Sequence, residues 1–377
     1  MLFDTIHDGG GELPRQCGEY GLQQEIGRGA YGTVYLASAP GGGRVAVKVC
    51  RREDIGDERY ERELRGAKLY RAIPPQEGLV RMLELVESPW GFFAVMELAD
   101  DEFGGPQEAS AGYRPKTLAS VIAGEKALPL GECVKLGVTL AKGLAALQRH
   151  HLLHRDIKPG NVIYVGGRPV LSDPGLVVEE AAAASLVGTP GYVPPESFTA
   201  ASGDVYSLGL TLKAASFGRK IEDLDKGPAL EADTGSRFFP AWWRILNKAT
   251  DPTPSRRYQS AKALLKDFES LNSIIVVVGS PLFKVSIALL ALIVLVVVWS
   301  LAASGGRSVS VQEVKEALLE DAIKNDPNLQ RIRSGEFERD MDRQLEELNR
   351  VKKEIDRRQA EFAPKSTDNE SDESTSK

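Results

Sequence analysis

Residues 154–162 read HRDIKPGNV, and they decide the fold of this chain. Asp156 and Asn161 lie five positions apart, with Lys158 between them. Transfer of a phosphoryl group needs a carboxylate that takes up the proton of the attacking hydroxyl, a cation beside the phosphate, and oxygen ligands for Mg²⁺. A surface loop of mixed charge would account for an isolated His-Arg-Asp triplet, but not for all nine residues in this order. The stretch therefore predicts a catalytic loop for phosphoryl transfer.

A glycine-rich stretch, residues 27–34, reads GRGAYGTV and lies between two runs typical of β-strands. Lys48 follows it, at the end of the run VAVK in residues 45–48. Glycines allow a hairpin to lie close over a triphosphate, with backbone N–H groups toward the phosphate oxygens. Alone, the stretch is equally compatible with a dinucleotide-binding fold, in which it would lie between a strand and a helix. Its position between two strands, followed by Lys48, favours a site for ATP phosphates.

Together these motifs resemble those of Hanks-type serine/threonine protein kinases. The resemblance extends over about Tyr20 to Leu271. It implies an α+β, two-lobed protein kinase fold, with a β-rich N-lobe and a helical C-lobe. It also implies ATP and Mg²⁺ as cofactors and proteins as substrates. Lys158, two residues after Asp156, is typical of the serine/threonine branch of the family.

The resemblance implies a catalytic role for four residues. Asp156 would accept the hydroxyl proton, Lys158 would steady the γ-phosphate, and Lys48 would bind the α- and β-phosphates. Lys48 is expected to pair with a glutamate on a helix over Asp57–Ala72, which ends before two prolines. That helix carries three candidate glutamates: Glu58, Glu61 and Glu63. Glu63 matches the family best, and a solvated charged face explains the other two.

The resemblance also implies that Asn161 and Asp173 hold Mg²⁺. Asp173 ends a predicted short strand and is followed by Pro174, where the family has phenylalanine. The carboxylate carries the metal chemistry, so the departure affects the packing that the phenylalanine controls, because proline is smaller and fixes φ. The glycine loop, the next strand and the hinge between the lobes are expected to contact the nucleotide through Gly27, Arg28, Gly29, Ala30, Gly32, Val34, Ala46, Lys48, Glu97 and Ala99.

Hydrophobic patterns predict the elements between these motifs. Strands are expected over Val80–Val86 and Phe92–Met96, with Met96 behind the nucleotide pocket or simply in the core. Apolar residues at helical spacing predict a helix over Leu130–His150 that leads to the catalytic loop. Asp204 resembles the aspartate that starts the central helix of the C-lobe, and an ordinary N-cap is the alternative.

Residues 173–196 resemble the activation segment of the family and end in GTPGYVPPE. By this resemblance, Thr189 is expected to brace Asp156. Glu196 is expected to pair with an arginine far along the chain, for which Arg257 is suited.

Two hydroxyls in this segment, those of Ser185 and Thr189, are candidate regulatory sites. A new phosphate brings about −1.5 to −2 charges and is stabilised by an arginine, for which Arg155 is the expected partner. Because Thr189 already has a bracing role, we expect autophosphorylation mainly at Ser185.

One run departs from the pattern of a soluble protein: residues 285–303 read VSIALLALIVLVVVWSLAA, without a charge. These nineteen residues span about 28 Å as a helix, close to the hydrocarbon thickness of a bilayer. A buried core helix is the alternative, but such a helix is seldom apolar on every face. We expect a single transmembrane helix, with the kinase domain on the cytoplasmic side, where ATP and reduced thiols occur. The layout resembles bacterial receptor-like kinases of the cell membrane.

The expected organisation has six parts. They are a flexible arm (1–18), the protein kinase domain (19–272), a short juxtamembrane linker (273–283), a transmembrane helix (284–303), an extracytoplasmic helical segment (304–362) and a disordered tail (363–377). The apolar residues 274–278 either end the last helix of the domain or lie at the membrane interface. Apolar residues at spacings of three and four between Phe337 and Phe362 fit either a coiled-coil seam, hence a homodimer, or a lone solvated helix.

Composition narrows the classes of partner. The net charge of −6 gives no reason to expect nucleic acid. The three cysteines, Cys17, Cys50 and Cys133, are widely spaced and fit neither a disulfide framework nor a zinc cluster.

Two rival functions fit part of the sequence. A pseudokinase scaffold is favoured only by Pro174, and a small-molecule kinase would lack the peptide-seating segment that ends at Glu196.

Overall fold

The computed structural model describes most of residues 16–279 and four positions beyond them. The described residues are 16–29, 32–104, 112–123, 126–173, 178–179, 188–198, 200–226, 234–279, 289, 292, 293 and 296. The chain divides into two units, Met1–Ser280 and Pro281–Lys377, and all the named helices and strands belong to the first. Outside the described residues lie most of the expected arm, Ala30, Pro174, Ser185, most of the expected transmembrane helix and everything after it.

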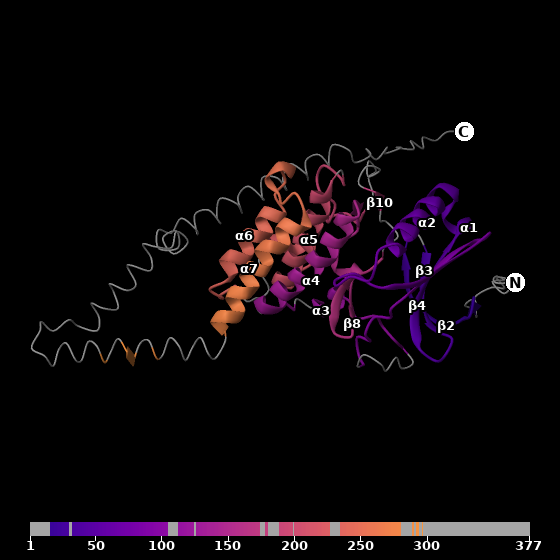
Figure 1. The fold of residues 1–377 in the computed structure, drawn as a ribbon, viewed down its shortest axis with the longest axis horizontal. Helices are drawn as coiled ribbons and strands as arrows, with labels where there is room; N and C mark the ends of the chain where they lie inside the picture. The colour runs from indigo at the N-terminus through magenta and orange to yellow at the C-terminus, as the bar shows by residue number, and fades with distance from the viewer. Residues whose placement is uncertain are drawn as a thin grey trace, which may run out of the picture. The chain divides into compact units, whose positions relative to one another are not determined.

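A six-stranded antiparallel sheet forms the N-lobe, in the order β1-β2-β3-β4-β6-β5 (Figure 1). Its strands are β1 Gln16–Cys17, β2 Tyr20–Gly29, β3 Gly32–Ser38, β4 Arg44–Arg51, β5 Met82–Ser88 and β6 Gly91–Met96. Successive side chains of a strand point to opposite faces. Val45, Val47 and Val49 of β4 therefore join an apolar cluster on one face, and Lys48 lies on the other.

Strand β1 lies within the stretch expected to be a flexible arm. Gln16 and Cys17 pair with the start of β2, and the side chain of Cys17 is fully buried among the valines of β4. The sequence around Cys17 is polar and Gly-rich, so no periodic pattern marks this single buried residue. Burial of its side chain explains why regular structure begins before residue 19.

Helix α2, Asp57–Arg71, packs against β5 and β6 and follows the short helix α1, Arg52–Ile55. Its buried residues recur every three or four positions and are Tyr60, Glu63, Leu64, Gly66, Ala67 and Tyr70. The predicted helix over Asp57–Ala72 is confirmed to within one residue. The two predicted strands before the hinge correspond to β5 and β6.

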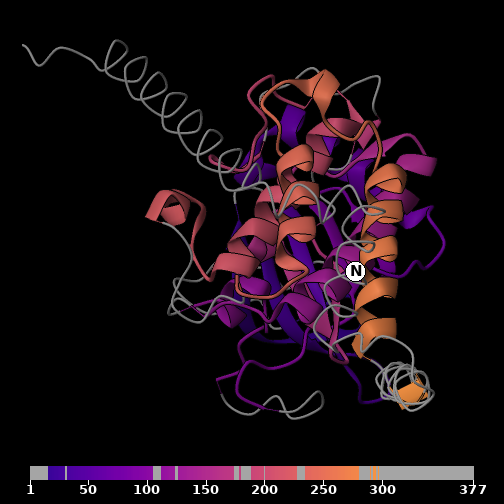
Figure 2. The same cartoon turned by 90° about the vertical axis from the view of Figure 1, so that its left-hand side faces the viewer.

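Helices form the C-lobe around α4, Leu130–Arg149, which confirms the helix predicted over Leu130–His150. The other helices are α3 Leu118–Val121, α5 Ala201–Phe217, α6 Phe239–Ala249 and α7 Ala261–Gly279, with the 3₁₀ helices η1 Pro159–Asn161, η4 Ile221–Lys226 and η5 Pro254–Arg256. Helix α4 packs against α5 and α7, and Leu140, Leu144 and Leu147 are fully buried there. Figure 2, turned by 90° from Figure 1, shows the C-lobe helices nearest the viewer, with α6 and α7 in orange tones.

Two small antiparallel sheets flank the catalytic loop. Strand β7, Leu152–Leu153, precedes the loop and pairs with β10, Val178–Glu179. Strand β8, Val162–Val165, follows the loop and pairs with β9, Arg168–Leu171. The end of β9 lies two residues before Asp173, so these pairings set the position of both catalytic segments.

The loop between α2 and β5 approaches α4 at two glycines. A Cβ atom on Gly78, which has φ of 81°, would lie 2.1 Å from the carbonyl oxygen of Thr139. A Cβ atom on Gly143 would lie 2.5 Å from the carbonyl oxygen of Gly78. In the same loop, Val80 N donates to the Leu171 carbonyl at 2.9 Å, and Leu171 N donates to the Gly78 carbonyl at 2.9 Å. The loop therefore ties the N-lobe to the strand that leads to Asp173.

Helix α7 continues to Gly279 and includes the apolar residues 274–278, which the sequence assigns either to the last helix or to a membrane interface. Ile274 and Val276 are exposed on it. Within the part of the chain that the structure describes, no helix is long and apolar enough to cross a membrane.

Candidate active site

The side chain of Lys48 bridges the two lobes. Its Nζ atom lies 2.6 Å from Oδ1 of Asp173 and 3.7 Å from Oε2 of Glu63. Of the three candidate glutamates, only Glu63 faces Lys48: Glu61 forms a surface ion pair with another residue, and Glu58 is exposed. The structure therefore brings Lys48 and Glu63 together, but the shorter contact of Lys48 is with Asp173.

Burial and charge act in opposite directions on these three groups. Burial is the largest single influence on Lys48 and would lower its pKa, but the charges of Asp173, Cys50 and Glu63 and the hydrogen bond to Asp173 together outweigh it and raise that pKa above its ordinary value. At Asp173, burial is the largest single influence and would raise the pKa, but the charge and hydrogen bond of Lys48, with the charges of His154 and Lys158, together lower it. Burial raises the pKa of the Glu63 carboxyl to about 7, and Lys48 offsets this only in part. Lys48 and Asp173 are therefore a charged pair, whereas Glu63 changes protonation near neutral pH.

Asp204 of α5 holds the backbone of the catalytic loop. Its two carboxylate oxygens accept hydrogen bonds from His154 N at 2.7 Å and Arg155 N at 2.8 Å. Arg155 has φ of 66°, a conformation that residues with side chains rarely adopt. The N-cap position of α5 belongs to Ala200. Asp204 is thus no N-cap, and its buried carboxyl group fixes the loop through these two hydrogen bonds, although burial raises the pKa of that group.

Three side chains converge on the carboxylate of Asp156. Thr189 Oγ1 donates to Oδ1 at 2.7 Å, and Lys158 Nζ lies 2.9 Å from Oδ2 and 2.6 Å from Thr189 Oγ1. Asn161 Nδ2 donates to Oδ2 at 2.7 Å and to the Asp156 carbonyl at 2.8 Å. The contact between Thr189 and Asp156 expected from the sequence is confirmed. These bonds fix the rotamer of Asp156 and leave its carboxylate beside one ammonium.

The oxygen donors of Asn161 and Asp173 fit a Mg²⁺ ion. The amide nitrogen of Asn161 is engaged by Asp156, which leaves Oδ1 as the atom available to a cation. The backbone carbonyl of Asn161 accepts hydrogen bonds from Ser172 N at 2.8 Å and from Ser172 Oγ at 3.0 Å. Ser172 is the neighbour of Asp173, so this contact links the two segments that carry the candidate ligands. Mg²⁺ commonly binds one or two protein oxygens together with substrate phosphates and water.

The glycine-rich stretch forms the hairpin between β2 and β3, with Gly29 paired to Gly32. Gly32 has φ of 149°, and a Cβ atom there would lie 2.5 Å from the Val49 carbonyl oxygen. Only glycine fits that position, which lets the hairpin lie close to β4. The side chain of Arg28 forms a surface ion pair with Glu25 at 2.6 Å, so its expected nucleotide contact is left to its backbone.

The hinge follows β6. Ala46 of β4 pairs with Met96, and both side chains are buried. Glu97 N donates to the Arg81 carbonyl at 3.1 Å, and the Ala99 carbonyl accepts from Tyr113 Oη at 3.0 Å. The remaining backbone groups available to an adenine are therefore the Glu97 carbonyl and the Ala99 N–H. Gly27 of β2 and Val34 of β3 pair across the hairpin.

The end of the activation segment is anchored to the C-lobe. Arg257 donates from Nη1 and Nη2 to the two carboxylate oxygens of Glu196, at 2.5 and 2.9 Å. The Arg257 side chain is fully buried, and its guanidinium lies over the ring of Tyr206. This confirms the predicted pair. A bidentate pair of this kind gives geometric specificity as well as energy.

The comparisons agree with this geometry. The family model described as "Protein kinase domain" matches residues 20–273. The chain belongs to this family. It is 32% identical over 264 residues to "Serine/threonine-protein kinase PknK" of Mycobacterium tuberculosis strain H37Rv, which covers 67% of this chain and 21% of that relative. It is 31% identical over 226 residues to "Serine/threonine-protein kinase AfsK" of Streptomyces coelicolor, covering 57% and 26%. The matches thus span about a fifth to a quarter of these relatives.

Two features of this protein kinase domain were not predicted from the sequence. The first is the close pairing of Lys48 with Asp173. No local signal reveals it, because the two residues are 125 positions apart. The second is Asp100, whose carboxylate accepts from Gly166 N at 2.8 Å and Gly167 N at 2.7 Å and so fixes the turn between β8 and β9. The two consecutive glycines are a turn signal, but their partner is not readable from the sequence.

Proposed function

We propose that the chain is a membrane-anchored serine/threonine protein kinase that transfers the γ-phosphate of ATP to protein hydroxyls, including its own. The observation that carries this proposal is the arrangement around Asp156, where Lys158, Thr189 and Asn161 all bind one carboxylate. That geometry supports a base held beside a cation. The names of the relatives support serine or threonine as the acceptor.

In this mechanism the residues mainly position and stabilise charge. Asp156 takes up the proton of the attacking hydroxyl, and Lys158 stabilises the charge of the transferring phosphoryl group. Lys48 binds the α- and β-phosphates and is held in place by Glu63. Asn161 and Asp173 would hold Mg²⁺, which neutralises phosphate charge when bound. Since Lys48 contacts Asp173 directly, binding of the nucleotide would exchange that contact for phosphate oxygens.

The membrane anchor is supported by the uncharged run of residues 285–303. Helix α7 ends at Gly279, six residues before this run, and exposes Ile274 and Val276 near its end. We place the kinase domain in the cytoplasm and residues 304–362 outside it. A tail that pairs with a second copy would give a homodimer and raise the rate at which one domain modifies another.

A transfer assay tests the enzymatic part. The purified full chain in detergent is incubated with γ-labelled ATP, Mg²⁺ and a generic basic protein, followed by phosphoamino-acid analysis. Label on serine and threonine is expected. ATP binding without transfer would favour the scaffold, and label on tyrosine alone would contradict the assigned acceptor.

Cysteine labelling of intact cells tests the topology. The native cysteines are buried, so single cysteines at exposed Ala263 of α7 and at Ser371 of the tail report each side. An impermeant maleimide is expected to label Ser371→Cys and to spare Ala263→Cys until the cells are opened. The reverse pattern would contradict the orientation, and labelling of neither or both positions would contradict the single span.

A further inference from the structure

Strand β2 contains a β-bulge at Gln23. Leu22 pairs with Ala37 of β3. Gln24 pairs with the adjacent residue of β3, Leu36, so Gln23 is one extra residue in the strand. Side chains alternate between the two faces of a strand, and an extra residue moves those that follow it to the opposite face. The bulge therefore turns Gln24 away from the face that Leu22 occupies.

This orientation places Gln24 on the side of the sheet that carries Lys48. Its partner Leu36 pairs in turn with Ala46 of β4, two residues before Lys48. Leu22, in contrast, packs against the apolar cluster that contains the valines of β4. A polar side chain just before the glycine-rich hairpin is thus presented to the face of the candidate nucleotide site.

The side chain of Gln24 contacts a segment that follows the hinge. Its Nε2 atom donates to the backbone carbonyl of Tyr113 at 2.9 Å. Tyr113 begins residues 113–117, which we name the strap. Lys116 N of the strap donates to the Asp100 carbonyl at 2.8 Å, and the Lys116 carbonyl accepts from a backbone N–H of β8 at 3.1 Å. The bond from Gln24 therefore ties a strand of the N-lobe to a segment that is fixed on the C-lobe.

Tyr113 also holds the hinge. Its side chain is buried, and its hydroxyl donates to the Ala99 carbonyl at 3.0 Å. The N–H at the other end of the same peptide group, that of Asp100, donates to the Tyr164 carbonyl at 2.7 Å. Because a peptide group is planar, these two bonds fix its orientation beside the Ala99 N–H. One residue thus contacts both the hinge and the strand that leads to the glycine-rich hairpin.

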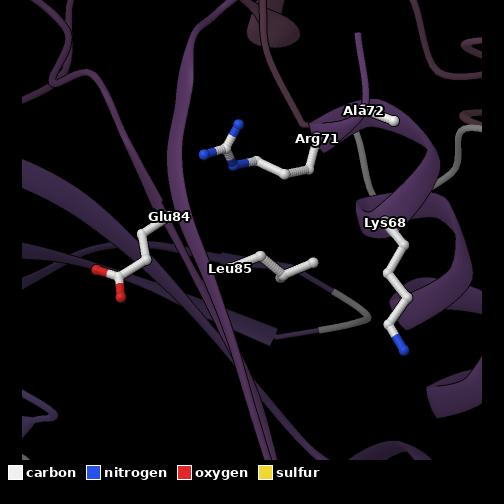
Figure 3. Close-up of a pocket in the computed structure, with 5 residues that line it drawn as sticks. All are labelled: Lys68, Arg71, Ala72, Glu84 and Leu85. Atoms are coloured by element: carbon white, nitrogen blue, oxygen red, sulfur yellow. The ribbon is translucent and has the colours of Figure 1, made fainter.

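Strand β2 is anchored at its start as well. Tyr20 Oη donates to Oε2 of Glu84 on β5 at 2.6 Å. Glu84 is one of the residues that line a pocket of about 380 Å³ between α2 and β5, as Figure 3 shows. After Gln24, the side chains of Glu25 and Arg28 pair with each other. Tyr20 and Gln24 therefore anchor β2 at two points, and the hairpin follows the second.

We propose that Gln24 is a positioning residue for the nucleotide. Its bond to Tyr113 holds β2 at a fixed distance from the hinge, and these two segments are the walls of the site expected to receive the base. Loss of the bond would let the walls separate and the nucleotide leave faster. This role rests on the proposed use of ATP, whereas the contact between β2 and the strap does not.

Binding and kinetics of the full chain in detergent test the role. Gln24→Met keeps the length of the side chain, removes its donor and adds no charge. It is expected to raise the Kd for ADP and the KM for ATP by about three- to tenfold, the usual net worth of a hydrogen bond. The single-turnover rate at saturating ATP should be nearly unchanged, since the groups around Asp156 are intact. Gln23→Met, the same change at the exposed bulge residue, should alter neither quantity. An unchanged Kd in Gln24→Met, or a loss confined to the single-turnover rate, would overturn the positioning role.

Amide hydrogen exchange without nucleotide tests the strap independently of activity. Gln24→Met and Tyr113→Phe are each expected to speed exchange in residues 24–29 and 97–101 by about three- to tenfold, as loss of a hydrogen bond makes local opening easier. Gln23→Met should leave it unchanged. Unchanged exchange in both variants would contradict the tether. Faster exchange in a chain whose wild type binds no ADP would refute the proposed function alone. Faster exchange with unchanged ADP affinity would refute the positioning role alone.

Discussion

Lys48 and Asp173 form a 2.6 Å ion pair across 125 positions of the chain and across the two lobes. The same lysine lies 3.7 Å from Glu63, which is fully buried. A single ammonium therefore contacts the candidate metal ligand and the candidate partner on α2. The position of the Lys48 ammonium therefore depends on two things: whether Glu63 is protonated, and whether Asp173 carries its charge.

Asp173→Asn separates metal binding from proton transfer. Removal of the charge should weaken Mg²⁺-dependent nucleotide binding by roughly 10- to 100-fold, the usual worth of a hydrogen bond or contact to a charged group. Titration of ATP affinity with and without Mg²⁺ measures it. An unchanged Mg²⁺ dependence would remove Asp173 from the metal site.

Glu63 should make stability depend on pH. Its pKa is raised to about 7 in the fold, above the ordinary value near 4.5, so folding favours the protonated form. This contribution is full below about pH 4.5 and is lost as the pH rises through about 7. Glu63→Gln, which mimics the protonated form, should flatten that part of the profile of unfolding temperature against pH. The exposed control Glu58→Gln should not, and a slope that survives in Glu63→Gln would show that another group causes it.

Lys213 should have an effect in a higher pH window. Burial in α5 lowers its pKa to about 7, although the ring of Trp243, 4.8 Å from Nζ, favours the charged form by a smaller amount. The fold therefore favours the neutral amine, and stability is expected to rise as the pH increases from about 7 toward about 10.5. Lys213→Met should stabilise the domain at pH 7 by more than about 1 kcal/mol and flatten this rise. Lys262→Met, at an exposed position, is the control, and destabilisation by Lys213→Met at pH 7 would contradict the argument.

Features that lie within one local motif could be predicted from the sequence, whereas contacts between distant segments mostly could not. The catalytic loop is continuous in sequence, so Asp156, Lys158 and Asn161 could be recognised together. The Glu196–Arg257 pair followed from the family resemblance, because each residue lies in its own motif. The Lys48–Asp173 contact and the approach of Gly78 to Gly143 join distant segments that no periodicity relates. Strand β1 was missed because one buried cysteine leaves no pattern.

Autophosphorylation between chains is expected at Ser185, which lies outside the described residues. The rate for the solubilised chain should rise with protein concentration, since two domains must meet. Polar substitution of Leu345 and Leu348 should lower phosphorylation in cells if the tail pairs. Phosphopeptide mapping that finds Ser185 unmodified in fully active enzyme would contradict the site. Unchanged phosphorylation in the Leu345/Leu348 double variant would contradict the role of the tail.

The most direct measurement compares wild type with Asp156→Asn in one preparation, recording both ATP affinity and phosphoryl transfer. Loss of the base should lower transfer by about 10²–10⁴-fold and leave ATP affinity nearly unchanged, because the proposed role of Asp156 is toward the acceptor hydroxyl. Asp54→Asn, the same change at an exposed position of α1, should behave as wild type. An Asp156→Asn chain that transfers phosphate at the wild-type rate would contradict the account, as would a wild-type chain that binds ATP and transfers nothing.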